Sequence, residues 1–137
     1  MNYPRLALAA FGATAVYFVL GGLLFALSPL RKEFAKYPAI YRTQENMKAV
    51  WPLGILGMLL SMVAVTAVFA LGVPAPSAVP AGLHFGALIG AFAVGSFVLH
   101  NHVNLNIGLR LTLGQAVAYF FQWTVVGVVI ALLYRPA

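Results

Sequence analysis

Three stretches of the chain contain no Asp, Glu, Lys or Arg, and their length restricts the fold more than any other feature. They run from Leu6 to Leu30, from Ala49 to Leu109 and from Leu111 to Tyr134. A helix needs about 20 apolar residues to cross the hydrocarbon of a bilayer, so the middle stretch is long enough for two spans. Only 7% of the residues are charged, against about 25% in soluble domains. A soluble globular fold is therefore excluded.

Prolines divide the middle stretch, because the segment 72–80 holds three of them and a continuous helix cannot pass through it. The sequence thus predicts an all-α fold, a four-transmembrane-helix bundle. It forms a single integral membrane domain over residues 1–137. The helices are expected near residues 5–28, 45–71, 80–101 and 113–134.

Local signals mark the predicted helix ends. Thr43 is a suitable N-cap for the second helix, and Pro80 suits the first position of the third. Thr112 followed by Gln115 matches a capping box ahead of the fourth helix. Pro52 lies inside the second predicted helix, where we expect it to cause a kink.

The first span has some features of a signal peptide. Arg5 precedes it, and Ala13-Thr14-Ala15 resembles a cleavage site. The apolar run continues to Leu27, however, which is longer than an ordinary signal core. We expect the segment to be retained as a helix.

Basic residues predict the orientation in the membrane. Cytoplasmic loops of membrane proteins carry an excess of Lys and Arg, and here two predicted loops hold six basic residues, against Arg5 and Arg135 on the opposite side. The prediction is that both connecting loops are cytoplasmic and both termini face the outer side. The six are Arg31, Lys32, Lys36, Arg42, Lys48 and Arg110.

The charge balance and the lack of cysteine exclude several functions. The net charge is +6, but basic residues that flank apolar spans are typical of membrane topology, so no nucleic acid partner is expected. Without cysteine, disulfides and thiolate metal sites are excluded. The two acids, Glu33 and Glu45, lie in or beside the first loop, so the chain is predicted not to be an enzyme.

Gly82, Gly86 and Gly90 recur every four residues in the third predicted helix and share one face. Such a face lets another helix approach closely in a membrane. The partner could be a helix of the same chain, a second copy or a different subunit. Ala9 and Ala13 form a less specific pair of the same kind. Isolated polar residues are expected to hydrogen-bond between helices: Thr14, Thr66, Gln115 and Gln122.

A polar cluster extends from His100 to Asn106. On a continuous helix His100 would face Asn104, and His102 would face Asn106, so the cluster could bind a lipid headgroup, a quinone carbonyl or a partner loop. Alternatively, it is the solvated end of the helix, terminated by Gly108 in a left-handed conformation. The candidate cofactor-binding residues are His100, Asn101, His102, Asn104 and Asn106.

His84 is a second candidate cofactor-binding residue, because it lies beside the glycine face and could ligate a haem or a pigment. His84 and His100 are about 24 Å apart along a helix, so both cannot ligate one haem. A hydrogen-bonded or interfacial histidine is the alternative, and no metal site is predicted.

Several segments resemble small bacterial four-helix membrane proteins of unknown function. They are Met1-Asn2-Tyr3, the first apolar span, Asn104-Leu105-Asn106-Ile107-Gly108 and Gln122-Trp123-Thr124-Val125-Val126-Gly127. The resemblance implies the fold and a bacterial inner membrane, and no catalytic residue.

Three functions follow from these features. The first is a non-enzymatic accessory or scaffold subunit of a larger membrane complex, which docks through the glycine face while its basic loop contacts anionic lipid or a cytoplasmic partner. The alternative is a binding protein for a hydrophobic cofactor or lipid, such as a pigment, haem or quinone, that uses His84 or the cluster from His100 to Asn106. The third is a small transporter or membrane enzyme.

Overall fold

The computed structural model describes residues 1–72 and 78–134, apart from the side chain of Gln44. The described part is helical and contains no strand. In this described part, four helices are long and apolar enough to cross a membrane, which confirms the predicted all-α fold with four long apolar helices. The first comprises α1 (Tyr3–Gly21) and the π-helical η1 (Gly22–Ala26), and the second is α4 (Trp51–Gly72). The third comprises α5 (Ala78–Ala93), the π-helical η2 (Val94–Leu99) and α6 (His100–Asn104). The fourth is α7 (Leu109–Leu133).

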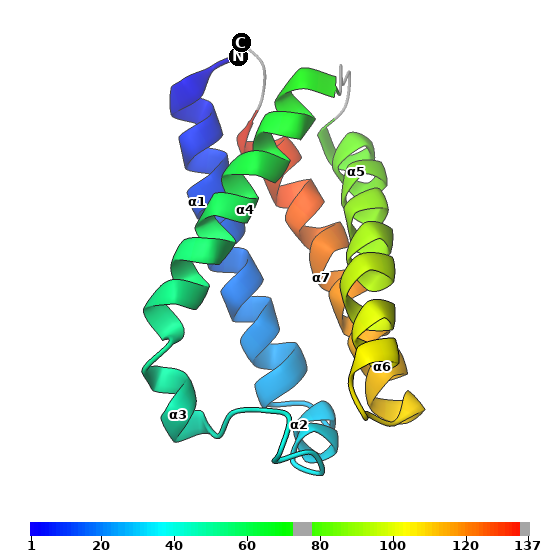
Figure 1. Cartoon of the computed structure of the whole chain (residues 1–137). Coiled ribbons are helices and arrows are strands. Elements are labelled where there is room, and N and C mark those ends of the chain that lie inside the picture. Colours follow the sequence, from blue (N-terminus) through cyan, green and yellow to red (C-terminus); the bar gives the residue numbers. More distant parts are fainter. Residues whose placement is uncertain (73–77, 135–137) are drawn as a thin grey trace.

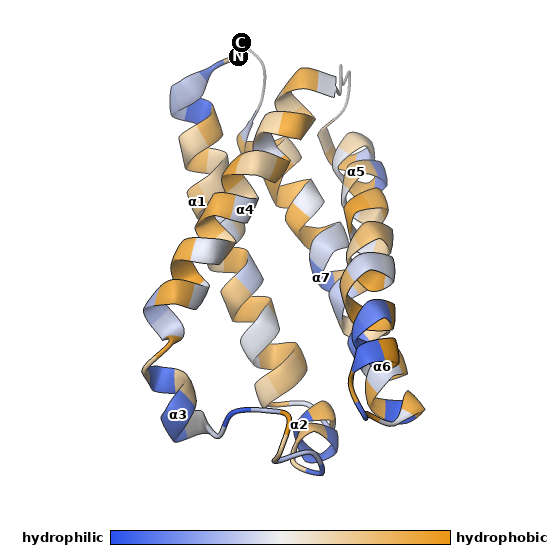
Figure 2. Ribbon diagram, in the orientation of Figure 1, coloured by the Kyte–Doolittle hydropathy of each residue, from blue (hydrophilic) through white to orange (hydrophobic). Residues whose placement is uncertain are grey.

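The polar segments gather at one end of the bundle. Two short helices, α2 (Leu30–Phe34) and α3 (Gln44–Lys48), lie at the same end as the turn between α6 and α7 (Figure 1). Figure 2 shows hydrophilic residues concentrated there, while the long helices are mainly hydrophobic. At the other end, the backbone N–H of Asn2 donates to the Tyr134 hydroxyl over 3.2 Å. The start of α1 and the end of α7 are thus held together.

The closest packing in the fold is between α5 and α7. A methyl group added at Gly86 would lie 2.6 Å from the Trp123 carbonyl oxygen, and one at Gly82 would lie 2.6 Å from the Val128 Cα. Gly127 of α7 faces Gly86 in turn. At Gly90 the added methyl would meet Phe120 at 3.0 Å. The glycine face of α5 therefore packs on α7 of the same chain, and we call this contact the α5–α7 seam.

Helix α4 packs much less closely than the others. It crosses α1 (Figure 1), and its buried residues are Met62, Thr66 and Phe69, all in its second half. Every residue from Trp51 to Gly57 is exposed. The small residues Ala9, Ala10 and Ala13 of α1 are fully buried in the core beside Met62 and Phe69. The fully buried residues of α4 are thus confined to its second half, and Met58 adds a partly buried contact with the core.

The structure corrects the predicted second helix, near 45–71. It is interrupted, since α3 ends at Lys48 and α4 begins at Trp51. Pro52 occupies the second position of α4, where its missing N–H costs nothing, so it starts a new helix and does not kink a continuous one. The Thr43 side chain accepts a hydrogen bond from the Asn46 N–H, which confirms it as the N-cap of α3.

The predicted capping box at Thr112 and Gln115 is wrong. The fourth span begins earlier, at Leu109, and Gly108 is its N-cap in an extended conformation with φ −73° and ψ 152°. Gly108 is therefore not the left-handed stop that the sequence suggested. Pro80 is the third residue of α5, which begins at Ala78. Most of the proline-rich segment, 73–77, and Arg135 lie outside the described residues.

Candidate functional site

The polar cluster from His100 to Asn106 does not converge on one point. Helix α6 ends at Asn104 and Leu105 is extended, so Asn106 does not share a helical face with His102. The Asn104 side-chain amide donates to the His100 backbone carbonyl over 3.0 Å, and both residues are exposed. This half of the cluster caps the helix locally and leaves the His100 imidazole directed away from the bundle.

His102 has a different role in the structure. Its Nδ1 lies 2.8 Å from the hydroxyl of Thr112, a fully buried residue of α7. The Tyr37 hydroxyl accepts a hydrogen bond of 2.8 Å from the Gly108 N–H in the same turn. These two contacts fix the α6–α7 turn against α7 and against the first loop, and ligand binding by His102 stays a prediction.

His84 is exposed on α5, although its neighbours Phe85 and Gly86 are buried in the seam. The His84 side chain is therefore not enclosed in the bundle core. Within the described residues, no three His, Cys, Asp or Glu side chains are grouped closely enough to hold a metal ion. The predicted ligation of a haem or pigment by His84 alone stays a prediction.

One of the isolated polar residues links two helices as predicted. The Gln122 amide donates to the Tyr17 backbone carbonyl over 2.6 Å, which joins α7 to α1. Thr14 instead donates to Ala10 of its own helix. The hydroxyl of Thr66 is fully buried and has no hydrogen-bond partner among the described residues. Gln115 is also buried, in the first half of α7.

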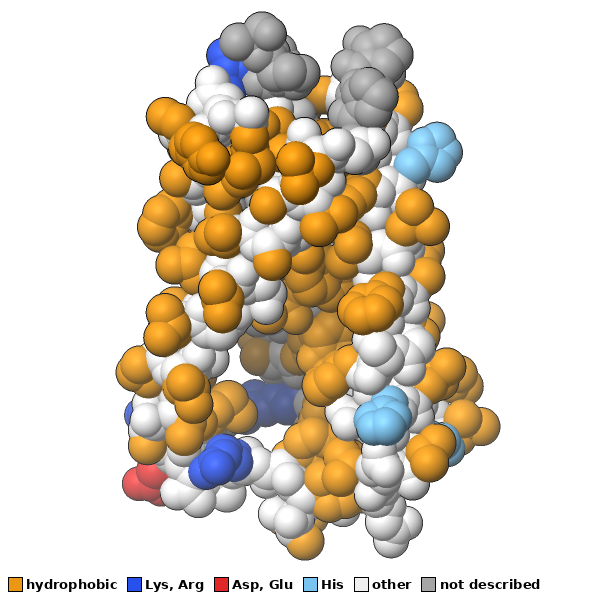
Figure 3. Space-filling view, turned by 45° about the horizontal axis from the view of Figure 1, so that its top comes forward, with side chains coloured by type: hydrophobic (Ala, Val, Ile, Leu, Met, Phe, Trp, Pro, Cys, Tyr) orange, Lys and Arg blue, Asp and Glu red, His pale blue; other side chains and the backbone are white. Residues whose placement is uncertain are grey.

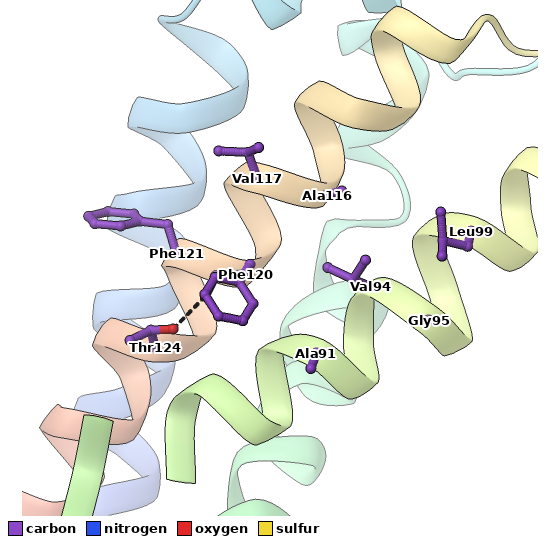
Figure 4. Close-up of a pocket in the computed structure, with 9 residues that line it drawn as sticks. All are labelled: Ala91, Val94, Gly95, Leu99, Ala116, Val117, Phe120, Phe121 and Thr124. Atoms are coloured by element: carbon purple, nitrogen blue, oxygen red, sulfur yellow. Dashed lines mark hydrogen bonds between the residues drawn. The ribbon is translucent and has the colours of Figure 1, made fainter. Parts of the chain in front are cut away.

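Two hollows stand out in the described structure, and the first is an apolar groove on the outside of the α5–α7 pair. Its volume is about 710 Å³. Residues of α5 and η2 form one wall and residues of α7 the other (Figure 4). The Thr124 hydroxyl in this groove already donates to the Phe120 carbonyl over 2.8 Å. The groove therefore offers an apolar surface of the kind that lipid chains cover.

The second hollow, which we call the basic-end pocket, has a volume of about 690 Å³. It lies between η1, α2, α3 and the first turn of α4. Sequence reasoning missed it, although aromatic residues alternate with basic ones over residues 31–51. Its lining comprises Gly21, Phe25, Ala26, Arg31, Phe34, Ala35, Pro38, Tyr41, Arg42, Thr43, Met47, Lys48 and Trp51.

Glu33 is paired with bases beside this pocket. Lys36 Nζ lies 2.9 Å from its carboxylate, and Arg110 Nε of α7 lies 3.5 Å away. The hydrogen bond from Lys36 lowers the pKa of the Glu33 carboxyl below its ordinary value, and the charge of Arg110 acts in the same direction. These pairs connect α2 to the start of α7 and keep the acid charged at neutral pH.

Comparison with protein-family models, with curated proteins and with solved structures gave no match to this chain. The resemblance to small bacterial four-helix membrane proteins stays a prediction. Functional inference therefore depends on the geometry described above.

Proposed function

We propose that the chain is a non-enzymatic accessory subunit of a larger membrane complex, and that it docks through α4. The sequence pointed to the glycine face of α5 as the docking surface. That face is occupied by α7 of the same chain, so another surface has to serve. The observation that supports the proposal is a second row of small residues, on α4, that no part of the described chain covers.

This row, which we call the α4 stripe, comprises Gly54, Gly57, Ser61 and Ala64. Spacings of three and four residues place them on one helix face. All four are exposed, and nothing described lies within 4 Å of a methyl group added at Gly54 or Gly57. The Ser61 hydroxyl donates to the Gly57 carbonyl over 2.9 Å, so it is satisfied without water. Small residues of this kind allow close helix contact in a bilayer.

The proposed location is a bacterial inner membrane with both termini on the outer side. The two ends of the described chain meet through Asn2 and Tyr134, opposite α2 and α3. Six basic residues lie at the α2 and α3 end, in these short helices, in the segment between them and in the first turn of α7. An excess of Lys and Arg is typical of the cytoplasmic side, and this distribution supports the orientation.

The test is gentle extraction from the native membrane, with mass spectrometry of co-purifying proteins and an absorption spectrum of the same sample. We expect a stoichiometric membrane partner with the wild-type chain. The Gly57→Leu variant should lose that partner but stay folded. The new side chain would contact nothing else in the described chain, and it would block the close approach of a partner helix. Gly22→Leu is the matched control, since Gly22 also faces open space on another span.

Two results would contradict the proposal. One is a chain that purifies alone under conditions that preserve known membrane complexes. The other is a partner that Gly57→Leu and Gly22→Leu retain equally. A chromophore bound to the isolated chain would instead favour the alternative, a protein that binds a hydrophobic cofactor.

A further inference from the structure

The basic-end pocket has the size and composition of a ligand site. Small-molecule sites enclose about 300–1,000 Å³ and combine apolar walls with a few placed polar groups; this pocket encloses about 690 Å³. It is formed by segments distant in sequence, from Gly21 at the end of α1 to Trp51 at the start of α4. The site therefore depends on how the first loop folds against two spans.

The charge of the lining has one sign. Arg31, Arg42 and Lys48 contribute three cations, and both carboxylates of the chain, Glu33 and Glu45, lie outside the lining. Glu33 is already paired with Lys36 and Arg110. Like charges collected in one pocket repel each other and favour an anionic ligand. Figure 3 shows Lys and Arg side chains at and within the hollow at this end of the molecule.

Four aromatic residues contribute to the wall, Phe25, Phe34, Tyr41 and Trp51, and the first three pack in a row. The Phe25 and Phe34 rings lie 6.2 Å apart between centroids, and Phe34 and Tyr41 lie 4.8 Å apart, both edge to face. Phe25 also contacts Tyr119 of α7 at 5.0 Å. The apolar wall is thus anchored to the bundle, and a ligand would find it already formed.

The position of the pocket selects a ligand that is both apolar and anionic. It lies where apolar spans meet the basic loops, and Trp51, which is 60% exposed, stands at its edge. Tryptophan is enriched at the headgroup level of membranes. The exposed first half of α4 leaves the pocket bordered by an apolar helix surface along the span. A lipid chain could follow that surface while the headgroup stays among the cations.

We propose that the basic-end pocket binds one molecule of an anionic phospholipid. Its phosphate lies among Arg31, Arg42 and Lys48, and its acyl chains lie along the aromatic wall and the first half of α4. Arginine is suited to phosphate because its planar guanidinium can donate two parallel hydrogen bonds. The pocket lining includes no residue of the α4 stripe, and the proposal does not depend on the proposed subunit role.

The experiment uses the full chain in nanodiscs of phosphatidylcholine with increasing phosphatidylglycerol. Brominated acyl chains on one lipid at a time quench nearby tryptophan fluorescence, and Trp51 reports on the pocket. We expect quenching by brominated phosphatidylglycerol to saturate at a low mole fraction. Brominated phosphatidylcholine should quench only in proportion to its abundance. Native mass spectrometry of the same protein should show one retained phosphatidylglycerol.

The six basic residues at this end divide into a test set and a matched control set. R31Q/R42Q/K48Q removes the three pocket cations, and K32Q/K36Q/R110Q removes three cations outside the lining at the same end. Basic residues near an anionic surface each contribute about 1 kcal/mol, a factor of about five. We expect the first variant to weaken selective phosphatidylglycerol binding at least about tenfold, and the second to change it much less.

A third variant, Ala35→Phe, keeps every charge and places a ring in the pocket. It should displace the retained lipid while leaving the fold intact, because Ala35 is exposed at the end of α2. Equal quenching by the two lipids at equal mole fraction would overturn the proposal. Equal losses in the two triple variants would also overturn it, since they would show diffuse attraction to the surface. Displacement of the lipid by free glycerol phosphate would point to a soluble anion instead.

Discussion

Two rows of small residues, on α5 and on α4, differ in what covers them. The row on α5 packs so closely on α7 that an added methyl group would overlap backbone atoms, while the row on α4 faces open space. Similar sequence patterns therefore have opposite structural roles in one chain. A row of small residues therefore predicts that another helix can pack closely there. Whether that helix belongs to the same chain depends on the fold.

The largest effect is expected from Gly86→Ala in the α5–α7 seam. The added methyl would lie 2.6 Å from the Trp123 carbonyl oxygen and close to the Thr124 backbone, and backbone cannot move aside cheaply. We expect a loss of about 3 kcal/mol or more in the free energy of unfolding. Unfolding in mixed micelles with increasing denaturing detergent measures it. A stable Gly86→Ala variant would show that the seam is looser than described.

Gly90→Ala should have a smaller effect in the same seam. Its added methyl would lie 3.0 Å from the Phe120 carbonyl oxygen and 3.2 Å from the Phe120 ring, and the ring can move. We expect a loss of about 1 kcal/mol, measured by the same detergent titration. An equal loss of stability in Gly90→Ala and Gly86→Ala would contradict the conclusion that helix packing is closer at Gly86 than at Gly90.

Gln122→Leu tests the polar contact that joins α1 to α7. It removes the hydrogen bond from the Gln122 amide to the Tyr17 carbonyl. Because hydrogen bonds between membrane helices average about 0.6 kcal/mol, we expect a destabilisation of about that size. A loss as large as that of Gly86→Ala would mean that polar contacts, and not close packing, hold the bundle together.

Gly57→Leu on the α4 stripe should change the stability of the isolated chain by no more than about 0.5 kcal/mol, as is usual for surface positions. Nothing described lies near the new side chain. Detergent unfolding of the purified chain, next to Gly86→Ala, measures the contrast between the two rows. A large loss of stability would show that another segment of the same chain packs against the α4 stripe.

The smallest effect concerns the ion pairs of Glu33 at the basic end. The folded-state pKa of Glu33 is lowered from 4.5, first by its hydrogen bond with Lys36. The stabilisation is therefore present above the unfolded pKa and is lost as the pH falls through the folded one. Glu33→Gln should be slightly less stable than wild type at pH 7, and the difference should shrink as the pH falls below 4.5 and vanish below the lowered folded-state pKa. Unfolding at a series of pH values would show this, and a difference that grew on acidification would contradict it.

Much of the fold follows from the sequence, because span length and charge distribution are local properties. The four spans and the shared face of Gly82, Gly86 and Gly90 could be predicted in this way. The start of α7 could not, since Gly108 takes an extended conformation and leaves Thr112 within the helix to bond His102. A local sequence pattern gives no information about that tertiary contact.

The candidate site was harder to predict than the fold. His84 was a candidate because it lies beside the glycine face, and His100 because it begins the polar cluster; the structure leaves both side chains exposed. The basic-end pocket depends instead on α2 and α3 folding back between two spans. The openness of the α4 stripe depends on how α4 crosses α1, which buries Met62, Thr66 and Phe69 and leaves residues 51–57 exposed. Neither arrangement is encoded in a short motif.

The most direct test of the difference between the small-residue rows of α5 and α4 is crosslinking in the native membrane. The chain has no cysteine, so Ser61→Cys gives a unique attachment point on the α4 stripe for a photoreactive probe. Leu88→Cys, on α5 and 71% exposed in the native chain, is the control. We predict a discrete protein adduct from position 61 and only lipid adducts from position 88. Lipid adducts alone from both positions would contradict a protein docking surface on α4.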